Sequence, residues 1–274
     1  MSASKIKPPS QTFQKYQTYN DTFLDQFLVK ATFKLRSITQ YYFQTLDTPG
    51  FQEYVTNLKA FTDSIREQLL TVAAGPTRAR LMHTLINRDI EALTNTKTTC
   101  HKGCGSCCYF EVEVTTEEAS RLAELILGGL EINHSHLELQ AGRISRSSKW
   151  ESGITDTNRC VFLGDDEACR VYEARPSACR KHMVTSPPSE CKTITGKPTI
   201  VLLPFTEAII SASLNLLSEP LTSLSKGVAD ALIGLEEKAT ADRESIAATI
   251  PIDLLAFQDE AAIGLNGHPK PLKN

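Results

Sequence analysis

The residues of this sequence best suited to chemistry are its eight cysteines. All of them lie between Cys100 and Cys191, and the rest of the 274 residues contain none. Cysteines that act only as small buried hydrophobic residues would be spread through the core helices instead. The first four are closely spaced and the second four widely spaced: Cys100, Cys104, Cys107, Cys108, Cys160, Cys169, Cys179 and Cys191. Clustered thiols of this kind indicate either a set of disulfides or thiolate ligands to a metal.

Metal ligation explains the clustering better than disulfide bonding does. Disulfides belong to oxidising compartments and mostly to small secreted domains. The opening residues, MSASKIKPPSQTFQ, include two lysines but no apolar segment of the secretory kind, so we expect a cytoplasmic protein. The adjacent residues Cys107 and Cys108 can bridge each other only under strain. The sequence therefore predicts that the thiolates bind a metal.

The first cysteine group lies in the segment CHKGCGSCC, residues 100–108. Gly103 and Gly105 allow the backbone to curl so that several sulfurs face one point. Three cysteines from one such loop and a fourth from a distant segment are typical ligands of a four-iron cluster, and zinc accepts the same thiolates. Enzymes that bind S-adenosylmethionine at an open iron share the spacing, but the strand before the loop and the βα series after it are absent here. The pattern favours an iron–sulfur cluster and leaves zinc as the alternative.

The second cysteine group supplies distal ligands to sites that the first group begins. Its gaps of eight, nine and eleven residues are too wide for the paired ligands of a zinc knuckle. Eight thiolates can serve either two four-ligand sites or one site with spare thiols. Because adjacent side chains point apart, Cys107 and Cys108 need not ligate the same metal.

Basic residues crowd around the second group. Four thiolates around zinc or an oxidised four-iron cluster leave a net charge of about −2, which nearby cations would offset. The candidates for this role are Arg159, Arg170, Arg175, Arg180 and Lys181. His101 and His182, which flank the cysteines, are weaker candidate ligands. His134 and His136 lie at an expected helix start, where we expect them to be solvated, and no metal is assigned to His83 or His268.

Apolar residues at helical spacing predict a mainly α protein, with a helical body around a loop-rich metal site and few short strands. One amphipathic helix is expected over residues 21–46, a second ends at Gly75, and a third runs to Leu93. YFEVEV after the first cysteines predicts a strand. Thr115 and Glu118 form a capping box that begins the next helix. Residues 135–148, 221–238 and 241–249 are predicted as further helices.

The expected organisation has four parts. These are a mobile leader over 1–20, a helical segment over 21–97, the cysteine-cluster metal-binding domain over 98–195, and a helical segment over 196–274 that packs on the same body. The net charge is −3, so no basic field indicates a nucleic-acid partner. The longest uncharged stretch, Ala208 to Ser218, is shorter than the roughly 20 residues that span a bilayer, so no membrane partner is expected either.

Four motifs resemble those of a known family: CHKGCGSCC, VEVTTEEASRLAEL, CVFL and CRVYEARPSACR, in that order. They are similar to the YkgJ-type cysteine-cluster proteins, the CxxCxxCC family, whose members are described as zinc- or iron-chelating domains. Over residues 98–191 the resemblance implies that the matched cysteines are ligands, with Cys191 at a less fixed position. Pro176 in the last motif is expected to fix a turn that aims Cys179, and Arg175 to offset thiolate charge.

We therefore interpret the chain as a metal-binding protein whose centre is structural, redox-active or metal-handling. Flagellin lysine methylases resemble the family in their cysteine cluster, so a protein-modifying enzyme acting on a protein substrate is an alternative. A metal-free thiol redox sensor is another. The sequence contains no Ser-His-Asp set, P-loop or His-Glu metal motif, and we assign no catalytic residue.

Overall fold

The computed structural model describes residues 22–92, 97–144, 154–192, 195–218 and 221–249. The expected leader over 1–20 lies outside these ranges. The chain divides into two units, Met1–Ala231 and Leu232–Asn274. The elements described below belong to the first unit, except that α11 runs from the first into the second.

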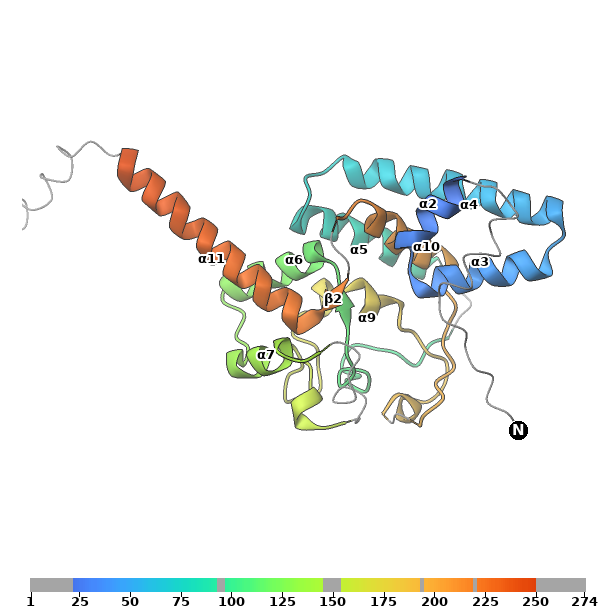
Figure 1. The fold of residues 1–274 in the computed structure, drawn as a ribbon. Helices are drawn as coiled ribbons and strands as arrows, with labels where there is room; N and C mark the ends of the chain where they lie inside the picture. Colours follow the sequence, from blue (N-terminus) through green and yellow to red (C-terminus); the bar gives the residue numbers. More distant parts are fainter. Residues whose placement is uncertain (1–21, 93–96, 145–153, 193–194, 219–220, 250–274) are drawn as a thin grey trace, which may run out of the picture. The chain divides into compact units, whose positions relative to one another are not determined.

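The elements of the described residues are mostly helices, which confirms the predicted fold class (Figure 1). The longer helices are α2 (Thr22–Phe27), α3 (Phe33–Thr45), α4 (Thr48–Leu70), α5 (Pro76–Glu91), α6 (Thr116–Leu127), α7 (His134–Ala141), α10 (Pro204–Asn215) and α11 (Leu224–Thr249). The shorter turns are η2 (Leu28–Lys30), η3 (Asp156–Asn158), η4 (Tyr172–Ala174), α9 (Ser177–Lys181) and η5 (Pro188–Cys191). Two-residue strands β1 (Glu113–Val114) and β2 (Thr222–Ser223) pair antiparallel.

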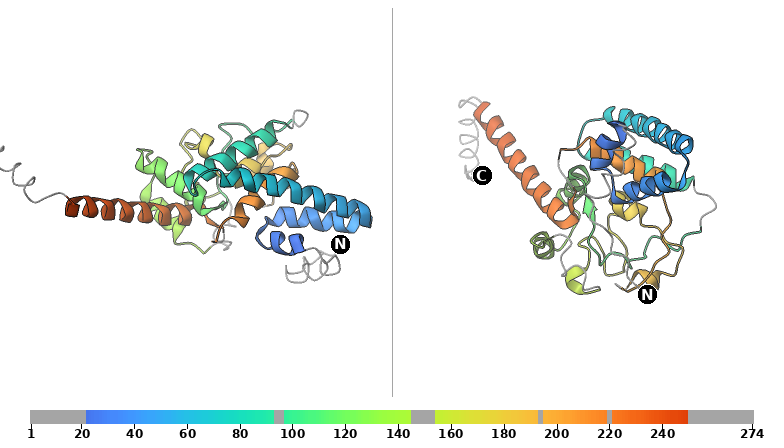
Figure 2. Two further views of the ribbon diagram at one scale, coloured as in Figure 1. Left: turned by 90° about the horizontal axis from the view of Figure 1, so that it is seen from above. Right: turned by 45° about the vertical axis from the view of Figure 1, so that its right-hand side comes forward.

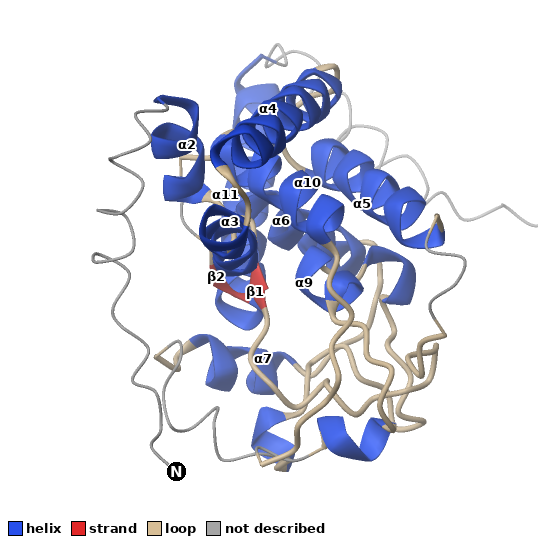
Figure 3. Ribbon diagram, turned by 90° about the vertical axis from the view of Figure 1, so that its right-hand side faces the viewer, coloured by secondary structure: helices blue, strands red, loops and turns tan. Residues whose placement is uncertain are grey.

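Helix α10 is the central helix of the first unit. Every residue from Thr206 to Leu214 is buried, so this helix is enclosed by other parts of the unit on all sides. It packs against α2, α3, α4 and α5, and its apolar residues join both of the hydrophobic clusters that these helices form. Helices α2, α3, α4, α5 and α10 lie on one side of the unit, and most of the loops that carry the cysteines lie on the other (Figures 2 and 3).

The predicted helix over residues 21–46 is interrupted. Its apolar stripe is buried as expected, but the chain leaves the helix at Ala31 and α3 begins after Thr32. The Thr32 hydroxyl accepts the Leu35 N–H at 3.1 Å as an N-cap, and the Thr32 N–H donates to Ser211 Oγ of α10. The break therefore depends on a contact with a residue far along the chain, which periodicity does not reveal.

Other predicted elements match in kind and differ in extent. The capping box of Thr115 and Glu118 is present and begins α6. The strand predicted in YFEVEV is reduced to β1, which pairs with residues just before α11. The helix predicted over 135–148 ends at Ala141, and the two helices predicted over 221–249 are one. No helix of the described residues combines the length and apolar character needed to cross a bilayer.

Candidate metal centre

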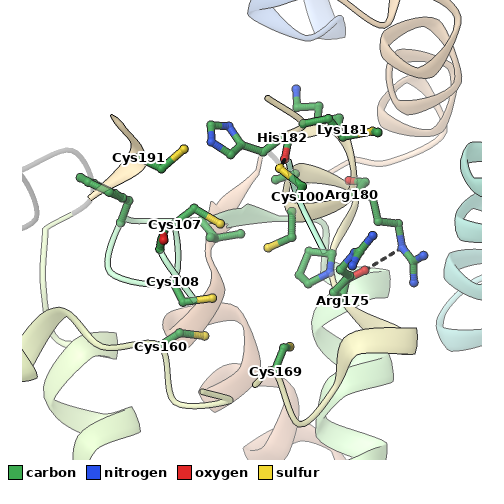
Figure 4. Close-up of a pocket in the computed structure, with 18 of the residues that line it drawn as sticks. Cys100, Cys107, Cys108, Cys160, Cys169, Arg175, Arg180, Lys181, His182 and Cys191 are labelled. Atoms are coloured by element: carbon green, nitrogen blue, oxygen red, sulfur yellow. Dashed lines mark hydrogen bonds between the residues drawn. The ribbon is translucent and has the colours of Figure 1, made fainter. Parts of the chain in front are cut away.

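All eight cysteines line a single cavity of about 850 Å³ (Figure 4). The two groups, which are far apart in the sequence, therefore meet in space. All eight lie in described residues, and none of them forms a disulfide. Cys191 is buried and the other seven are half-buried, so their sulfurs are shielded from solvent without being closed off.

The first cysteine loop is held at both ends by the second cysteine segment. Thr99 N–H donates to the Val184 carbonyl at 2.9 Å, and Val184 N–H donates to Cys100 Sγ at 3.4 Å. At the other end, Cys160 N–H donates to the Cys108 carbonyl at 2.8 Å. These backbone contacts fix the two groups of sulfurs relative to each other.

Two glycines permit this loop for different reasons. Gly103 has a φ of +93°, which residues with a side chain rarely adopt, so it forms the turn between Cys100 and Cys104. Gly105 instead lies against the second segment, and a methyl group there would be 2.7 Å from the Glu167 carboxylate. Gly103 therefore lets the backbone curl, as expected, whereas Gly105 lets the loop lie close to the second cysteine segment.

A small hairpin brings Cys160 and Cys169 to the cavity. Leu163 and Cys169 form an antiparallel bridge, and Arg170 N–H donates to the Phe162 carbonyl at 2.8 Å. Phe162 is almost fully buried beside them. Because the hairpin folds the chain back on itself, Cys160 and Cys169 both reach one cavity although eight residues separate them in the sequence.

Helix α9 carries Cys179 and begins directly after Pro176, in agreement with the turn expected there. It packs against α5, α10 and β1. After α9, Thr185 N–H donates to the Thr199 carbonyl and Val201 N–H to the Met183 carbonyl. The cysteine segment is thereby joined to the chain that enters the central helix α10.

Glu118 connects α9 to the helical body, a role that the sequence did not indicate. Its Oε1 accepts from His83 Nε2 at 2.8 Å and from Ser177 N–H at 2.6 Å, and its Oε2 accepts from Thr115. Burial alone raises the pKa of Glu118, but these hydrogen bonds outweigh burial and hold the pKa below its usual value. Arg121 donates to His83 Nδ1, and burial lowers the pKa of His83, so this histidine is neutral with its proton on Nε2.

His136 is not the solvated residue that was expected. It is half-buried, and its Nε2 lies 2.8 Å from the Arg159 carbonyl. Gln140, which is buried, donates to the same carbonyl at 2.8 Å. Helix α7 therefore holds the backbone directly before Cys160. The i, i+4 spacing of His136 and Gln140 indicates that the two side chains share one face of the helix, but it does not reveal that both contact the Arg159 carbonyl.

Arg175 is the basic residue whose charge faces the thiols. Its guanidinium carbon lies 3.9 Å from the centre of the Tyr172 ring, and its buried Nε has no hydrogen-bond partner among the described residues. Burial raises the pKa of Cys100 and Cys169, and the positive charge of Arg175 opposes this rise. The hydrogen bond with Cys108 is the main cause of the lowered pKa of Cys107, and Arg175 adds to it.

The other four basic residues near the cysteines are engaged elsewhere. Arg180 donates to the Arg175 carbonyl (dashed in Figure 4), to Asn87 and to the Glu173 carbonyl. Lys181 pairs with Glu207 of α10 at 3.0 Å. Arg159 donates to the Gly164 carbonyl, and Arg170 pairs with Asp166 on the surface. These contacts position the cysteine segment more than they offset charge in the cavity.

Burial keeps most of these thiols protonated in the absence of a cation. It raises the pKa of Cys160 to about 12 and that of Cys179 well above its ordinary value. Cys107 and Cys108 share a hydrogen bond, which lowers the pKa of Cys107 to about 7 and raises that of Cys108. A metal would supply the compensating charge and displace these protons.

The thiols are distributed around the cavity wall. In the described part of the chain, no three Cys, His, Asp or Glu side chains gather tightly enough to hold one ion. Both His101 and His182 line the cavity, and His101 Nδ1 lies 2.9 Å from the Thr99 carbonyl oxygen. Neighbouring cysteines Cys107 and Cys108 both line the cavity.

Comparison with known proteins identifies the segment that supplies the eight cysteines of this cavity. Residues 99–196 match the model of the CxxCxxCC family, described as a "putative zinc- or iron-chelating domain". The match covers about a third of the chain. The matched segment includes all eight cysteines, and the resemblance inferred from their motifs is confirmed. No curated protein and no solved structure matches the chain.

Proposed function

We propose that the CxxCxxCC domain holds an iron–sulfur centre through its cysteine thiolates. The observation that carries the proposal is that all eight thiols, from both ends of the domain, line one cavity without forming disulfides. The family description supports a bound metal, either zinc or iron. The choice of an iron–sulfur centre over zinc is our inference from the site's geometry.

The donor set suits a soft metal. Thiolate ligands select zinc, copper(I) or iron–sulfur clusters, whereas magnesium and calcium take oxygen ligands. A structural zinc site closes around one ion, with zinc–sulfur distances of about 2.3 Å. Thiols spread over the wall of an 850 Å³ cavity are better matched to a larger inorganic core than to a single ion.

The chain's own residues would hold and shield such a centre. The cysteines would ligate it, Arg175 would offset the charge of the thiolates, and the buried side chains of Phe162 and Val171 would exclude water from one wall. When bound, an iron–sulfur centre supplies one-electron redox chemistry and also cross-links the segments that ligate it.

Anaerobic purification followed by iron, sulfide and zinc analysis tests the proposal. We expect brown protein with iron and acid-labile sulfide in equal amounts. Stoichiometric zinc without iron would overturn the iron–sulfur assignment, and metal-free protein with eight titratable thiols would favour a thiol redox sensor.

A ligand variant links this metal to the cavity. We expect Cys104→Ser to lower both the metal content and the free energy of unfolding, because Cys104 lines the cavity. Met183→Leu is the matched control, since Met183 lines the same cavity with a thioether sulfur and the exchange nearly conserves volume. Unchanged metal in Cys104→Ser would remove Cys104 from the ligands.

A further inference from the structure

The cysteines lie at two levels of the cavity. In Figure 4, Cys191, Cys107 and Cys100 lie on the side of the cavity where His182 and Lys181 are found. Cys108, Cys160 and Cys169 lie on the opposite side. The division separates Cys107 from its neighbour Cys108, although both line the same cavity.

Backbone contacts hold the first level together. Cys100 Sγ accepts the Val184 N–H and lies 3.7 Å from the His182 carbonyl, so it is fixed to the chain that leads on to Cys191. The turn closed by Cys104 N–H and the His101 carbonyl brings Cys104 to the same end of the loop. Figure 4 places Cys191 on this same side of the cavity.

Different contacts hold the second level together. Cys160 N–H donates to the Cys108 carbonyl, so these two residues are direct neighbours. The bridge between Leu163 and Cys169 places Cys169 on the same hairpin as Cys160. Cys179 lines the same cavity from α9, and α9 packs against β1, the strand that follows Cys108, so Cys179 is assigned to this level.

Cys107 neighbours both levels, and the count of ligands decides its place. The second level already has four cysteines, which is the full ligand number of a zinc site or a four-iron cluster. The first level has three without Cys107 and four with it. Each level then has a complete set of four thiolates.

We propose that the cavity holds two metal centres, each with four cysteine ligands. This inference rests on the proposed metal-binding function. It adds the number of metal centres and the cysteines that ligate each one. The first centre is ligated by Cys100, Cys104, Cys107 and Cys191. The second centre is ligated by Cys108, Cys160, Cys169 and Cys179.

The placement of Arg175 fits two centres. Arg175 lines the cavity, and in Figure 4 it lies between Cys100 of the first level and Cys169 of the second. Two sets of four thiolates concentrate negative charge in one cavity, and a cation that faces both sets lowers their mutual repulsion. With four protein ligands each, neither centre keeps an open position for a substrate, so the arrangement suits electron transfer or structural support more than substrate activation.

Pairs of ligand variants test the assignment through metal content. The single variants Cys191→Ser and Cys169→Ser should each retain about half of the metal of the unchanged protein. Cys107→Ser/Cys191→Ser, within one set, should also retain about half. Cys107→Ser/Cys169→Ser, across the sets, should retain none, although it removes the same number of thiols. Glu124→Gln, at a half-exposed position of α6 outside the cavity lining, is the control and should keep full metal content.

Several outcomes would overturn the two-centre inference alone. If both single variants lose all metal, or if the two double variants retain equal amounts, the ligands belong to one centre. The unchanged protein gives a test that needs no variant: two four-iron clusters require about eight irons and eight sulfides per chain, and about four of each would contradict the inference. Metal-free unchanged protein would refute the proposed function itself, so the two failures are distinguishable.

Discussion

At the scale of single residues, the cavity depends on how charge is arranged around sulfur. Burial opposes the ionisation of thiols such as Cys160 and Cys179, so a bound cation has to supply most of the stabilisation of their thiolates. Arg175 adds to this because it is stacked on Tyr172 and faces the thiols, with no carboxylate partner among the described residues. Two basic residues of the second cysteine segment therefore differ in effect. Arg175 lines the cavity and can stabilise a bound metal, whereas Arg170 forms a surface ion pair with Asp166.

Arg175→Gln should weaken metal binding by about 10-fold, as is typical when a residue that supports metal ligands is removed. The physical reason is that the thiolates lose the positive charge that offsets theirs in the cavity. Competition with a chelator, followed by metal analysis, measures the change. Arg170→Gln is the matched control, because Arg170 pairs with Asp166 on the surface. The metal affinity of this variant should equal that of the unchanged protein. Equal affinities in the two variants would contradict the role given to Arg175.

At the scale of elements, a buried polar network positions the short helix α9. The network joins α5 through His83, α6 through Glu118 and Arg121, and α9 through Ser177. A five-residue helix is too short to be stable through its own hydrogen bonds, so its position comes from such contacts. Cys179 follows Ser177 by two residues, and its place in the cavity depends on Glu118 for this reason.

Glu118→Gln should lower the free energy of unfolding by about 3 kcal/mol, because an amide cannot accept all the hydrogen bonds that the two carboxylate oxygens accept in this buried site. Urea unfolding of the metal-loaded protein measures the change. Glu124→Gln is the comparison on the same helix: Glu124 is half exposed and pairs with Arg80 at 3.7 Å, so its loss should stay within about 0.5 kcal/mol. Similar losses in both variants would show that the network does not hold α9.

At the scale of the whole first unit, two kinds of structure lie side by side. The helices around α10 bury two clusters of apolar residues and need no metal to do so. The described cysteine segments contain short turns, the helix α9 and isolated bridges, and therefore few ladder hydrogen bonds. We therefore expect the cysteine segments to depend on the metal and the helices around α10 to be stable without it.

Removal of the metal should loosen the cysteine segments selectively. We expect the backbone amides of residues 99–110 and 160–191 to exchange hydrogen at least about tenfold faster, while those of α4 and α10 keep their protection. Hydrogen exchange with mass spectrometry, on metal-loaded and chelator-treated protein, measures both regions in one sample. A uniform increase over the helices and the loops would contradict this division and would show that the metal supports the entire unit.

From the sequence alone, the positions of the helices and the chemistry of the site were largely accessible. Apolar spacing located α4 and α5, and the capping box at Thr115 located the start of α6. The distribution of the cysteines indicated thiolate ligation, and their motifs indicated the CxxCxxCC family. These features are local: they depend on residues within a few positions of one another, and on side-chain chemistry that does not change with the fold.

Only the tertiary structure showed which distant residues meet. The break before Thr32 depends on Ser211, the position of α9 depends on Glu118, and the carbonyl before Cys160 is held by His136. The separation of Cys107 from Cys108 into different levels likewise follows from the segments that flank them. Each of these contacts joins residues that no spacing rule connects, because their approach is set by the packing of whole elements around α10 and not by the chain between them.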